Sequence, residues 1–232
     1  MNENIRLLPN LWKEVEMKVI ELFSGTECLS NEFRKRGHKC WTVDWDEQFP
    51  SSLHKDIYEL TIDDIPEEFR HADVVWLGTD CTTYSIAAIS KHRKKNPITG
   101  NLDPVSDKAK RADATNLHCK ELIKQINPKI QIWENPMGGF RKMTFNKDLV
   151  LNTTTYCQYG FPYRKQTDFL SNIELPLRKP CKNGAPCHMP APRGSQNSIN
   201  GWKSKKIKSM YPPELCKHIV DICEAYIEGG DK

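Results

Sequence analysis

The stretch Val74-Val-Trp-Leu-Gly-Thr-Asp-Cys-Thr-Thr-Tyr-Ser85 decides the fold. Its first five residues are apolar or small and rich in β-branched side chains, so they predict a short buried strand. Cys81 follows where this strand opens into a loop, and in open α/β sheets ligands bind at the carboxyl ends of the strands. By residue type alone, Cys81 is an ordinary small apolar side chain. The rest of the chain favours a nucleophile.

A βαβ unit precedes this stretch. Residues 18–23 predict a strand, Ser24-Gly-Thr26 turns the chain into a helix that ends at Gly37, and residues 39–43 predict a second strand. The second strand ends on Asp44, about twenty residues after the turn, which is the spacing needed to hold a ribose through both vicinal hydroxyls. An ordinary βα turn with a solvated aspartate is the alternative.

A second acid ends another buried strand. A helical turn at 66–70 leads into the Cys81 strand, and Ser106 predicts the cap of a helix that runs to about Ile126. Residues 129–133 then predict a strand that ends at Glu134. Because adjacent parallel strands lie about 5 Å apart, Cys81 and Glu134 can face one pocket. The remaining predicted elements are an antiparallel hairpin, 152–159 with 165–172, and a last helix, 214–227.

Composition predicts one cytoplasmic domain. With 232 residues and 38% hydrophobic content, the chain can bury one sizeable core, so we predict a single catalytic domain over residues 1–232. No run approaches the roughly 18 apolar residues of a membrane span, and the N-terminus lacks the apolar core of a signal peptide. We therefore expect no membrane partner, and we expect the nine cysteines to be reduced. We also expect a monomer, although the sequence leaves the oligomeric state open. Residues 1–16 have the spacing of a short amphipathic arm.

Basic residues cluster in three places, 91–95, 108–111 and 203–208. Each run is usually a solvated face, but three together favour a surface that faces phosphates. Residues 85–104 carry no helical or alternating pattern and predict a long basic loop that could serve as a lid. The nucleic-acid-binding residues expected from these clusters are Ser85, Lys91, Arg93, Lys94, Arg193, Lys203 and Lys205.

Six short motifs follow one another on the predicted elements: Glu21-Leu-Phe-Ser-Gly25, Val43-Asp-Trp45, Asp56-Ile57, Asp80-Cys81, Glu134-Asn-Pro136, and Gln158-Tyr-Gly160 with Arg164-Lys165. In this order they resemble the cytosine-5 DNA methyltransferases over about residues 18 to 172. The compact size is similar to that of the small phage- and prophage-type members. The resemblance implies the Rossmann-like fold of S-adenosylmethionine-dependent methyltransferases, a mostly parallel sheet with an antiparallel terminal hairpin.

The resemblance also implies a reaction, transfer of a methyl group from S-adenosylmethionine to carbon 5 of cytosine in DNA. Cys81 would add to carbon 6 as a thiolate, Glu134 would hydrogen-bond nitrogen 3 and the amine, and Arg164 or Lys165 would face the carbonyl oxygen. The base would have to be flipped out of the duplex. The cofactor contacts implied by the resemblance are Phe23, Ser24, Gly25, Thr26, Asp44, Trp45, Asp56 and Ile57.

The chain departs from the family pattern in several places, including the hairpin, where Tyr163, Lys165 and Thr167 stand in place of a glutamine and two alternating arginines. Glu27 and Cys28 stand where the family has further glycines, Asp80 stands where proline usually precedes the nucleophile, and residues 173–211 form only a short irregular basic segment instead of a target-recognition domain. An RNA or free nucleotide substrate, a catalytically inactive nucleic-acid-binding module, and a transferred group other than methyl therefore stay open as alternatives. The recognition sequence and a restriction partner stay open too.

The C-terminal part holds possible metal ligands. Cys181, Cys187 and His188, with Cys157, Cys216 or His218, could supply four zinc ligands. Their spacing matches no specific pattern, so we favour loop cysteines and a helix face that carries Cys216 and His218, with no metal, and leave a zinc site at Cys181, Cys187 and His188 open as the alternative.

Overall fold

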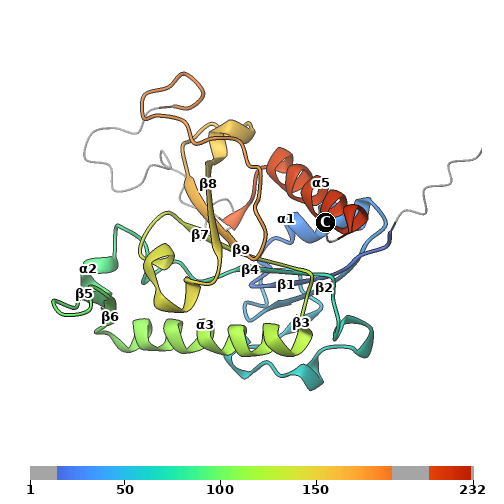
Figure 1. Ribbon diagram of the computed structural model, residues 1–232, viewed down its shortest axis with the longest axis horizontal. Coiled ribbons are helices and arrows are strands. Elements are labelled where there is room, and N and C mark those ends of the chain that lie inside the picture. Colours follow the sequence, from blue (N-terminus) through green and yellow to red (C-terminus); the bar gives the residue numbers. More distant parts are fainter. Residues whose placement is uncertain (1–14, 190–208, 231–232) are drawn as a thin grey trace, which may run out of the picture.

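Seven strands form one mixed sheet in the computed structural model, which describes residues 15–189 and 209–230 (Figure 1). In spatial order they are β3 (Leu53–His54), β2 (Lys39–Asp44), β1 (Lys18–Leu22), β4 (Val74–Gly78), β7 (Ile130–Pro136), β9 (Gln166–Ser171) and β8 (Val150–Thr155). The first five strands are parallel, and β9 is antiparallel to both of its neighbours. The predicted α/β class, with a mostly parallel sheet and an antiparallel terminal hairpin, is confirmed.

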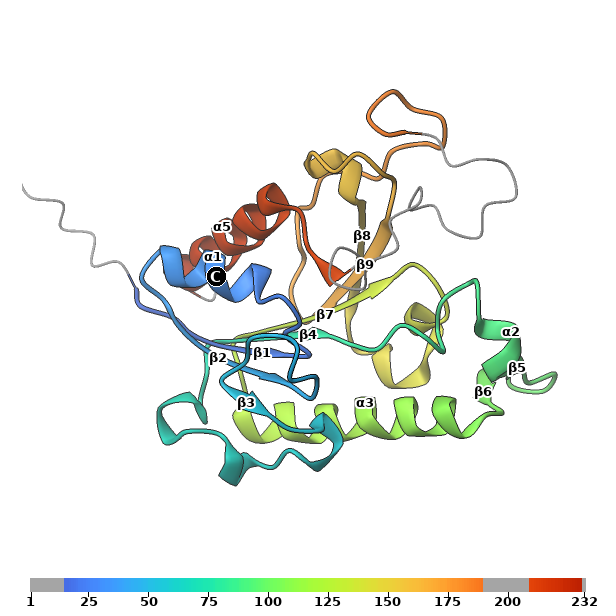
Figure 2. The same ribbon diagram turned by 180° about the vertical axis from the view of Figure 1, so that it is seen from behind.

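Helices cover both faces of the sheet. Helix α3 (Asp107–Ile126) lies on one face, and α1 (Cys28–Lys35) and α5 (Pro213–Gly229) lie together on the other (Figures 1 and 2). Strand side chains alternate between the two layers, so Val75 and Leu77 pack in the α3 cluster, while Val74 and Trp76 pack in the α1 and α5 cluster. The short 3-10 helices are η1 (Ile57–Glu59), η2 (Ile62–Asp64), η3 (Glu67–Phe69), η4 (Phe140–Lys142), η5 (Thr144–Asn146) and η6 (Tyr156–Tyr159).

The long helix begins and ends as its sequence predicts. The Ser106 hydroxyl accepts a hydrogen bond from the Ala109 amide at 3.2 Å, which satisfies one of the free amides of the first turn of α3. Asn127 ends the helix in the left-handed conformation, with φ of 52°.

Three predicted boundaries are wrong. Residues 156–159 form η6 and do not extend the hairpin strand, and β7 continues past Glu134 to Pro136. The loop predicted over residues 85–104 contains α2 (Ile89–His92) and a small hairpin of β5 (Arg93–Lys95) and β6 (Leu102–Pro104). These strands are too short to show an alternating pattern, so tertiary contacts decide their conformation.

Two predicted segments lie wholly or partly outside the described residues. Of the predicted arm, residues 1–14 are not described, and of the segment 173–211, residues 190–208 are not described. In the described part of that segment, residues 173–189 contain no helix or strand. None of the helices within residues 15–189 and 209–230 has the length and apolar character needed to cross a membrane.

Glu21 should make stability depend on pH. The carboxyl group is buried in β1, where Ser30 donates to Oε2 from its amide and its hydroxyl. Burial raises the pKa of Glu21 from 4.5 to about 7, so the folded protein binds a proton that the unfolded chain releases between these values. Stability should therefore fall as pH rises from 4.5 to 7, by up to about 3 kcal/mol.

A Glu21→Gln variant tests this expectation. It should match the parent protein near pH 5 and unfold at a higher urea concentration at pH 8, because glutamine keeps the acceptor without the buried charge. If the free energies of unfolding of the two proteins differed by the same amount at every pH from 5 to 8, the raised pKa of Glu21 would be contradicted.

Candidate active site

Cys81 and Glu134 lie at the same edge of the sheet. Strand β4 ends at Gly78, three residues before Cys81, and Gly78 pairs in register with Glu134 of β7. The neighbouring Asn135 side-chain amide donates to the carbonyl oxygen and the hydroxyl of Thr79, at 3.3 and 3.0 Å. Strand β7 thus supplies the carboxylate and also holds the segment that leads to Cys81.

Two polar groups from the terminal hairpin face Glu134. The Tyr156 hydroxyl donates to Glu134 Oε1 at 3.2 Å, and the Lys165 ammonium lies 3.7 Å from the same oxygen. Lys165 also donates to the Tyr156 hydroxyl at 3.4 Å. Because Glu134 is buried, with 5% of its surface exposed, these contacts hold a carboxylate that would be costly to bury alone.

Arg164 points to a different partner. Its guanidinium donates to the Cys181 carbonyl from Nε and Nη2, both at 3.3 Å, and from Nη2 to Gln166 Oε1 at 2.9 Å. Of the two cations that the sequence offers, the structure therefore brings Lys165 to the carboxylate.

The charges around Cys81 act in opposite directions. Burial raises the pKa of the Cys81 thiol, Lys165 lowers it, and Glu134 and Asp80 raise it. The Asp80 carboxylate turns toward the loop, where it accepts hydrogen bonds from the amide of Thr82 at 2.9 Å and from its hydroxyl at 2.5 Å. Asp80 thus fixes the turn that carries Cys81, although its charge opposes formation of the thiolate.

A pocket of about 650 Å³ opens beside Cys81. Asp80 and Thr82, on either side of Cys81, line one part of it. Five of the eight predicted cofactor residues line the pocket as well, and they are Phe23, Gly25, Asp44, Trp45 and Asp56. The indole of Trp45 is 67% exposed, which is unusual for so large an apolar ring and suits a stacking partner.

The first βα turn is tightly curled. Phe23, Gly25 and Glu27 have φ of 59°, 50° and 52°, in the left-handed region that favours glycine. The Gly25 amide donates to Asp44 Oδ2 at 2.8 Å, which joins the turn to the end of β2. Glu27, where the family has glycine, accepts hydrogen bonds from Arg34 Nη1 at 3.0 Å and from the Thr42 hydroxyl at 2.6 Å, which offset its backbone strain.

The other three predicted cofactor residues do not line the pocket. Ser24 is buried between Phe23 and Gly25, and its hydroxyl has no hydrogen-bond partner among the residues that the structure describes. Thr26 Oγ1 lies 3.0 Å from Cys28 Sγ. The Ile57 side chain lies in the hydrophobic core, so the predicted contact of Ile57 with the adenine edge would have to be made by its backbone.

Arg111 and Tyr211 also belong to this region, although no motif identified them. Arg111 of α3 lines the pocket, pairs with Asp56 at 2.7 Å and lies over the Tyr58 ring. Tyr211, just before α5, packs against Gly78 so closely that a Cβ there would meet its hydroxyl at 2.7 Å. Helical spacing from the pocket-lining Lys108 could have indicated Arg111, but no sequence signal places Tyr211.

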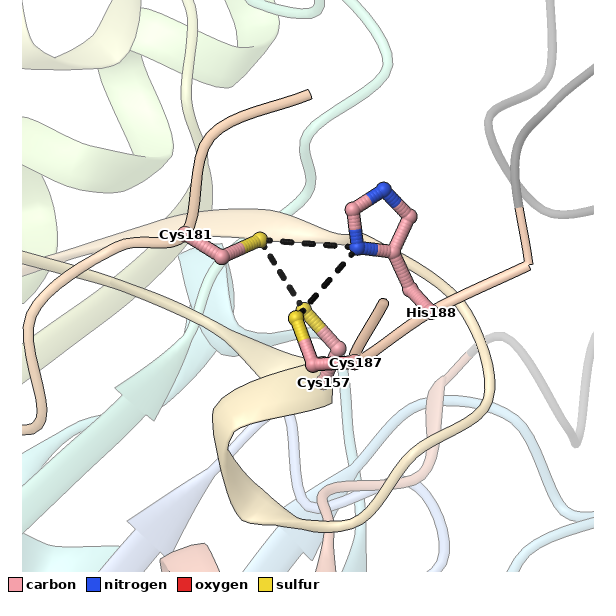
Figure 3. A group of neighbouring side chains, drawn as sticks. All are labelled: Cys157, Cys181, Cys187 and His188. Atoms are coloured by element: carbon pink, nitrogen blue, oxygen red, sulfur yellow. Dashed lines mark hydrogen bonds between the residues drawn. The ribbon is translucent and has the colours of Figure 1, made fainter. Parts of the chain in front are cut away.

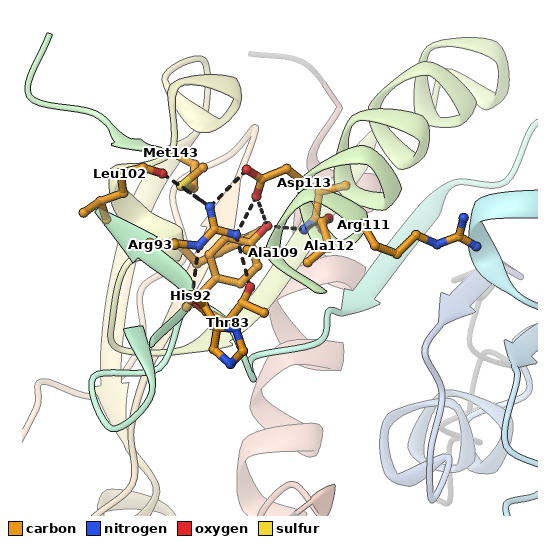
Figure 4. A network of polar contacts seen from close by, with 12 residues as sticks. Thr83, His92, Arg93, Leu102, Ala109, Arg111, Ala112, Asp113 and Met143 are labelled. Atoms are coloured by element: carbon orange, nitrogen blue, oxygen red, sulfur yellow. Dashed lines mark hydrogen bonds and ion pairs between the residues drawn. The ribbon is translucent and has the colours of Figure 1, made fainter. Parts of the chain in front are cut away.

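The prediction that Arg93 contacts nucleic acid is wrong, because its guanidinium is fully buried (Figure 4). It forms a bidentate ion pair with Asp113 of α3, in which Nη2 donates to Oδ1 at 2.6 Å and Nη1 donates to Oδ2 at 3.0 Å. It also donates to the Thr83 carbonyl at 3.1 Å and lies over the Tyr84 ring, 4.1 Å from its centroid. Arg93 therefore ties the residues that follow Cys81 to α3.

The remaining predicted nucleic-acid contacts divide into three groups. Lys91 and Lys94 are exposed. Ser85 pairs with Gly138 in an isolated antiparallel bridge, so the loop after Cys81 lies beside the turn after Glu134. The others lie outside the described residues and are Arg193, Lys203 and Lys205.

Comparison with known proteins confirms the resemblance to the cytosine-5 DNA methyltransferases. The chain is 27% identical over 230 residues to the "Probable DNA (cytosine-5)-methyltransferase" of Frog virus 3 (isolate Goorha), a match that covers 89% of this chain and 100% of that protein. No protein-family model matches the chain.

Two solved structures are similar over part of their length. The Dnmt2 methyltransferase of S. pombe is 15% identical, with a TM-score of 0.47, over 68% of this chain and 52% of that one. A predicted DNA modification methyltransferase encoded within a prophage (E. coli) is 21% identical, with a TM-score of 0.48, over 67% and 46%. This chain thus spans about half the length of these two proteins.

Proposed function

We propose that this protein transfers a methyl group from S-adenosylmethionine to carbon 5 of cytosine in DNA, through a covalent adduct at Cys81. One observation carries the proposal: a cysteine just after β4, a buried carboxylate on β7 and a lysine just before β9 lie at the same end of the sheet, where the lysine and the carboxylate influence the thiol, beside a pocket lined by Asp44 and Trp45. The relative in Frog virus 3 supports the same reaction.

Each site residue has a role in this reaction. The Cys81 thiolate adds to carbon 6, which makes carbon 5 nucleophilic enough to take the methyl group, and the demethylated cofactor would leave as the neutral thioether. Loss of the carbon 5 proton to solvent, with expulsion of the thiolate, then restores the double bond and releases the product. Glu134 accepts a hydrogen bond from the exocyclic amine and shares a proton with nitrogen 3, while Tyr156 and Lys165 hold its carboxyl group in place. Lys165 also lowers the pKa of the Cys81 thiol and so favours the thiolate.

The pocket suits S-adenosylmethionine, which would supply an electrophilic methyl group. Trp45 offers an exposed ring for the adenine, and Asp44 offers acceptors for the ribose hydroxyls in addition to the backbone amides that it already binds. The unpartnered buried hydroxyl of Ser24 could serve the methionine part. DNA would approach from the side of Lys91 and Lys94, with residues 173–211 as a short recognition segment and the target base flipped into the site.

Radiolabel transfer tests the proposed substrate. Tritium from methyl-labelled S-adenosylmethionine should enter duplex DNA, and digestion should release it as 5-methylcytosine. Transfer RNA and dCMP, incubated in parallel, should stay unlabelled. Label in either of these would move the assignment to an RNA or nucleotide substrate, and no label anywhere, with cofactor binding measured separately, would favour a non-catalytic module.

Trp45 should contribute strongly to cofactor affinity. Stacking of an aromatic side chain on a base contributes about 1–3 kcal/mol, so Trp45→Ala should raise the Kd for S-adenosylmethionine roughly 5- to 150-fold. Trp45→Phe, which keeps a stacking ring, is the matched control and should lose much less. Calorimetric titration measures both, and equal affinities for the alanine variant and the parent protein would place the adenine elsewhere.

A further inference from the structure

Four potential metal ligands lie close together at the loop end of the β8–β9 hairpin, outside the site around the Glu134 carboxylate. Cys157 comes from η6, and Cys181, Cys187 and His188 come from the segment that follows β9 (Figure 3). The three sulfurs and Nδ1 of His188 all lie within 4.8 Å of one another. Both cysteines and the histidine of that segment face the thiol of η6, although 24 residues separate Cys157 from Cys181.

The distances are those of a tetrahedral site. With Zn–S near 2.3 Å and Zn–N near 2.0–2.1 Å, tetrahedral ligand atoms should lie about 3.8 Å apart for two sulfurs and about 3.6 Å apart for sulfur and nitrogen. Cys157 and Cys187 are 3.8 Å apart at Sγ, and His188 Nδ1 lies 3.6 and 3.5 Å from the sulfurs of Cys181 and Cys187. The sulfurs of Cys157 and Cys181 lie closer, at 3.2 Å, still far beyond the roughly 2.05 Å of a disulfide, and all four ligand atoms lie within 4.8 Å of one another.

Hydrogen bonds from neighbouring residues fix the positions of Cys181 and Cys187. The Cys181 amide donates to the Thr155 hydroxyl at 3.1 Å, and Arg164 donates to the Cys181 carbonyl. Gln158 Nε2 donates to Cys187 Sγ at 3.3 Å, the kind of hydrogen bond that stabilises a metal-bound thiolate. The positive charge of Arg164 would also compensate the net negative charge that three thiolates and one divalent ion leave.

We propose that Cys157, Cys181, Cys187 and His188 bind one zinc ion through three thiolates and Nδ1. Soft sulfur ligands with one imidazole in tetrahedral geometry select zinc, and four protein ligands leave no open position for a substrate, so the site is structural. Its role follows from its place in the fold. Residues 173–189 contain no helix or strand, and the ion would fasten this segment to η6. The expectation of no metal is revised accordingly.

Metal analysis of the full chain tests the proposal without any measurement of activity. Protein purified without chelators should contain about one zinc per chain by inductively coupled plasma mass spectrometry. Cys187→Ser, at an exposed position, and His188→Ala should each lose most of it. Cys40→Ser, a half-buried thiol on β2, is the matched control and should keep it. His188→Cys should also keep it, because a thiol at that position can replace the Nδ1 ligand.

Thermal unfolding gives the second measurement. A strong chelator should lower the Tm of the parent protein and of Cys40→Ser by several degrees and should leave Cys187→Ser unchanged. Metal-free protein that takes up no zinc on addition and keeps its Tm would overturn the proposal. A disulfide between Cys157 and Cys181 in protein isolated without reductant, found by peptide mapping, would overturn it too. Neither result depends on whether the methyltransferase proposal holds.

Discussion

Replacing Cys81 by alanine should abolish methyl transfer, with a loss of at least about 1000-fold, because the proposed reaction has no route to the carbon 6 adduct without the thiol. Affinity for S-adenosylmethionine should stay within about twofold, since the pocket is lined by neighbours of Cys81 and not by Cys81 itself. Duplex DNA that contains 5-fluorocytosine adds a direct measurement. The parent protein, given the cofactor, should form a denaturation-resistant complex of increased mass, and Cys81→Ala should form none.

The cysteine on β2 again supplies the control. Cys40→Ser should retain both methyl transfer and trapping, because this thiol lies on the second strand and not at the Cys81 loop. A trapped complex that persists in Cys81→Ala, or that disappears in Cys40→Ser, would exclude Cys81 as the specific nucleophile. Trapping on DNA but not on matched RNA would identify Cys81 as the nucleophile, cytosine in DNA as the target base and its carbon 5 as the methylated atom.

Arg93→Met should destabilise the fold by about 3 kcal/mol, because it leaves the Asp113 carboxylate in a largely buried site without its ion-pair partner and with only the Tyr84 hydroxyl as a side-chain donor among the described residues. Thr83 would also lose the donor to its carbonyl. Urea unfolding should show the loss as a lower midpoint. Lys94→Met is the matched control, since this neighbour is exposed, and should change stability by less than about 0.5 kcal/mol.

A double variant separates ion-pair loss from other causes. Arg93→Met with Asp113→Leu should recover part of the stability, because no charge is left unpaired. The recovery should be incomplete, because the Tyr84 hydroxyl keeps its hydrogen bond from Asn116 but loses Asp113 as its acceptor. If Arg93→Met instead weakened DNA binding and left the urea midpoint unchanged, the side chain would have the nucleic-acid role that the sequence first indicated.

The strand ends were predictable, whereas contacts between distant segments were not. Buried runs that end on Cys81 and near Glu134 define two parallel strands, and their shared edge follows from the fold class. A run of basic residues does not reveal that Arg93 faces inward, since its partner Asp113 lies a full hairpin later in the chain. Nor does the pair Arg164-Lys165 tell which cation faces Glu134, because successive residues at a strand entry point in different directions.

The sequence offered six candidate zinc ligands, and for a related reason it could not show which four of them the fold brings together. Three of its members lie close together in sequence, but the fourth, Cys157, comes from η6 on the far side of β9. Pattern recognition by spacing fails when the ligands come from two separate segments that only the folded hairpin brings together.

The loop end of the β8–β9 hairpin links the cysteine cluster to Glu134. The Tyr156 amide donates to the Lys165 carbonyl at 3.0 Å, so the two residues that hold Glu134 are clamped to each other by the backbone. Cys157, the inner member of the sulfur cluster, is the next residue after Tyr156. Displacement of that cysteine would reach the Glu134 carboxylate through the peptide bond to Tyr156 and then through the Tyr156 hydroxyl, which donates to Glu134. If this chain binds zinc and transfers methyl groups as proposed, we expect oxidation of the cluster or removal of its metal to slow methyl transfer.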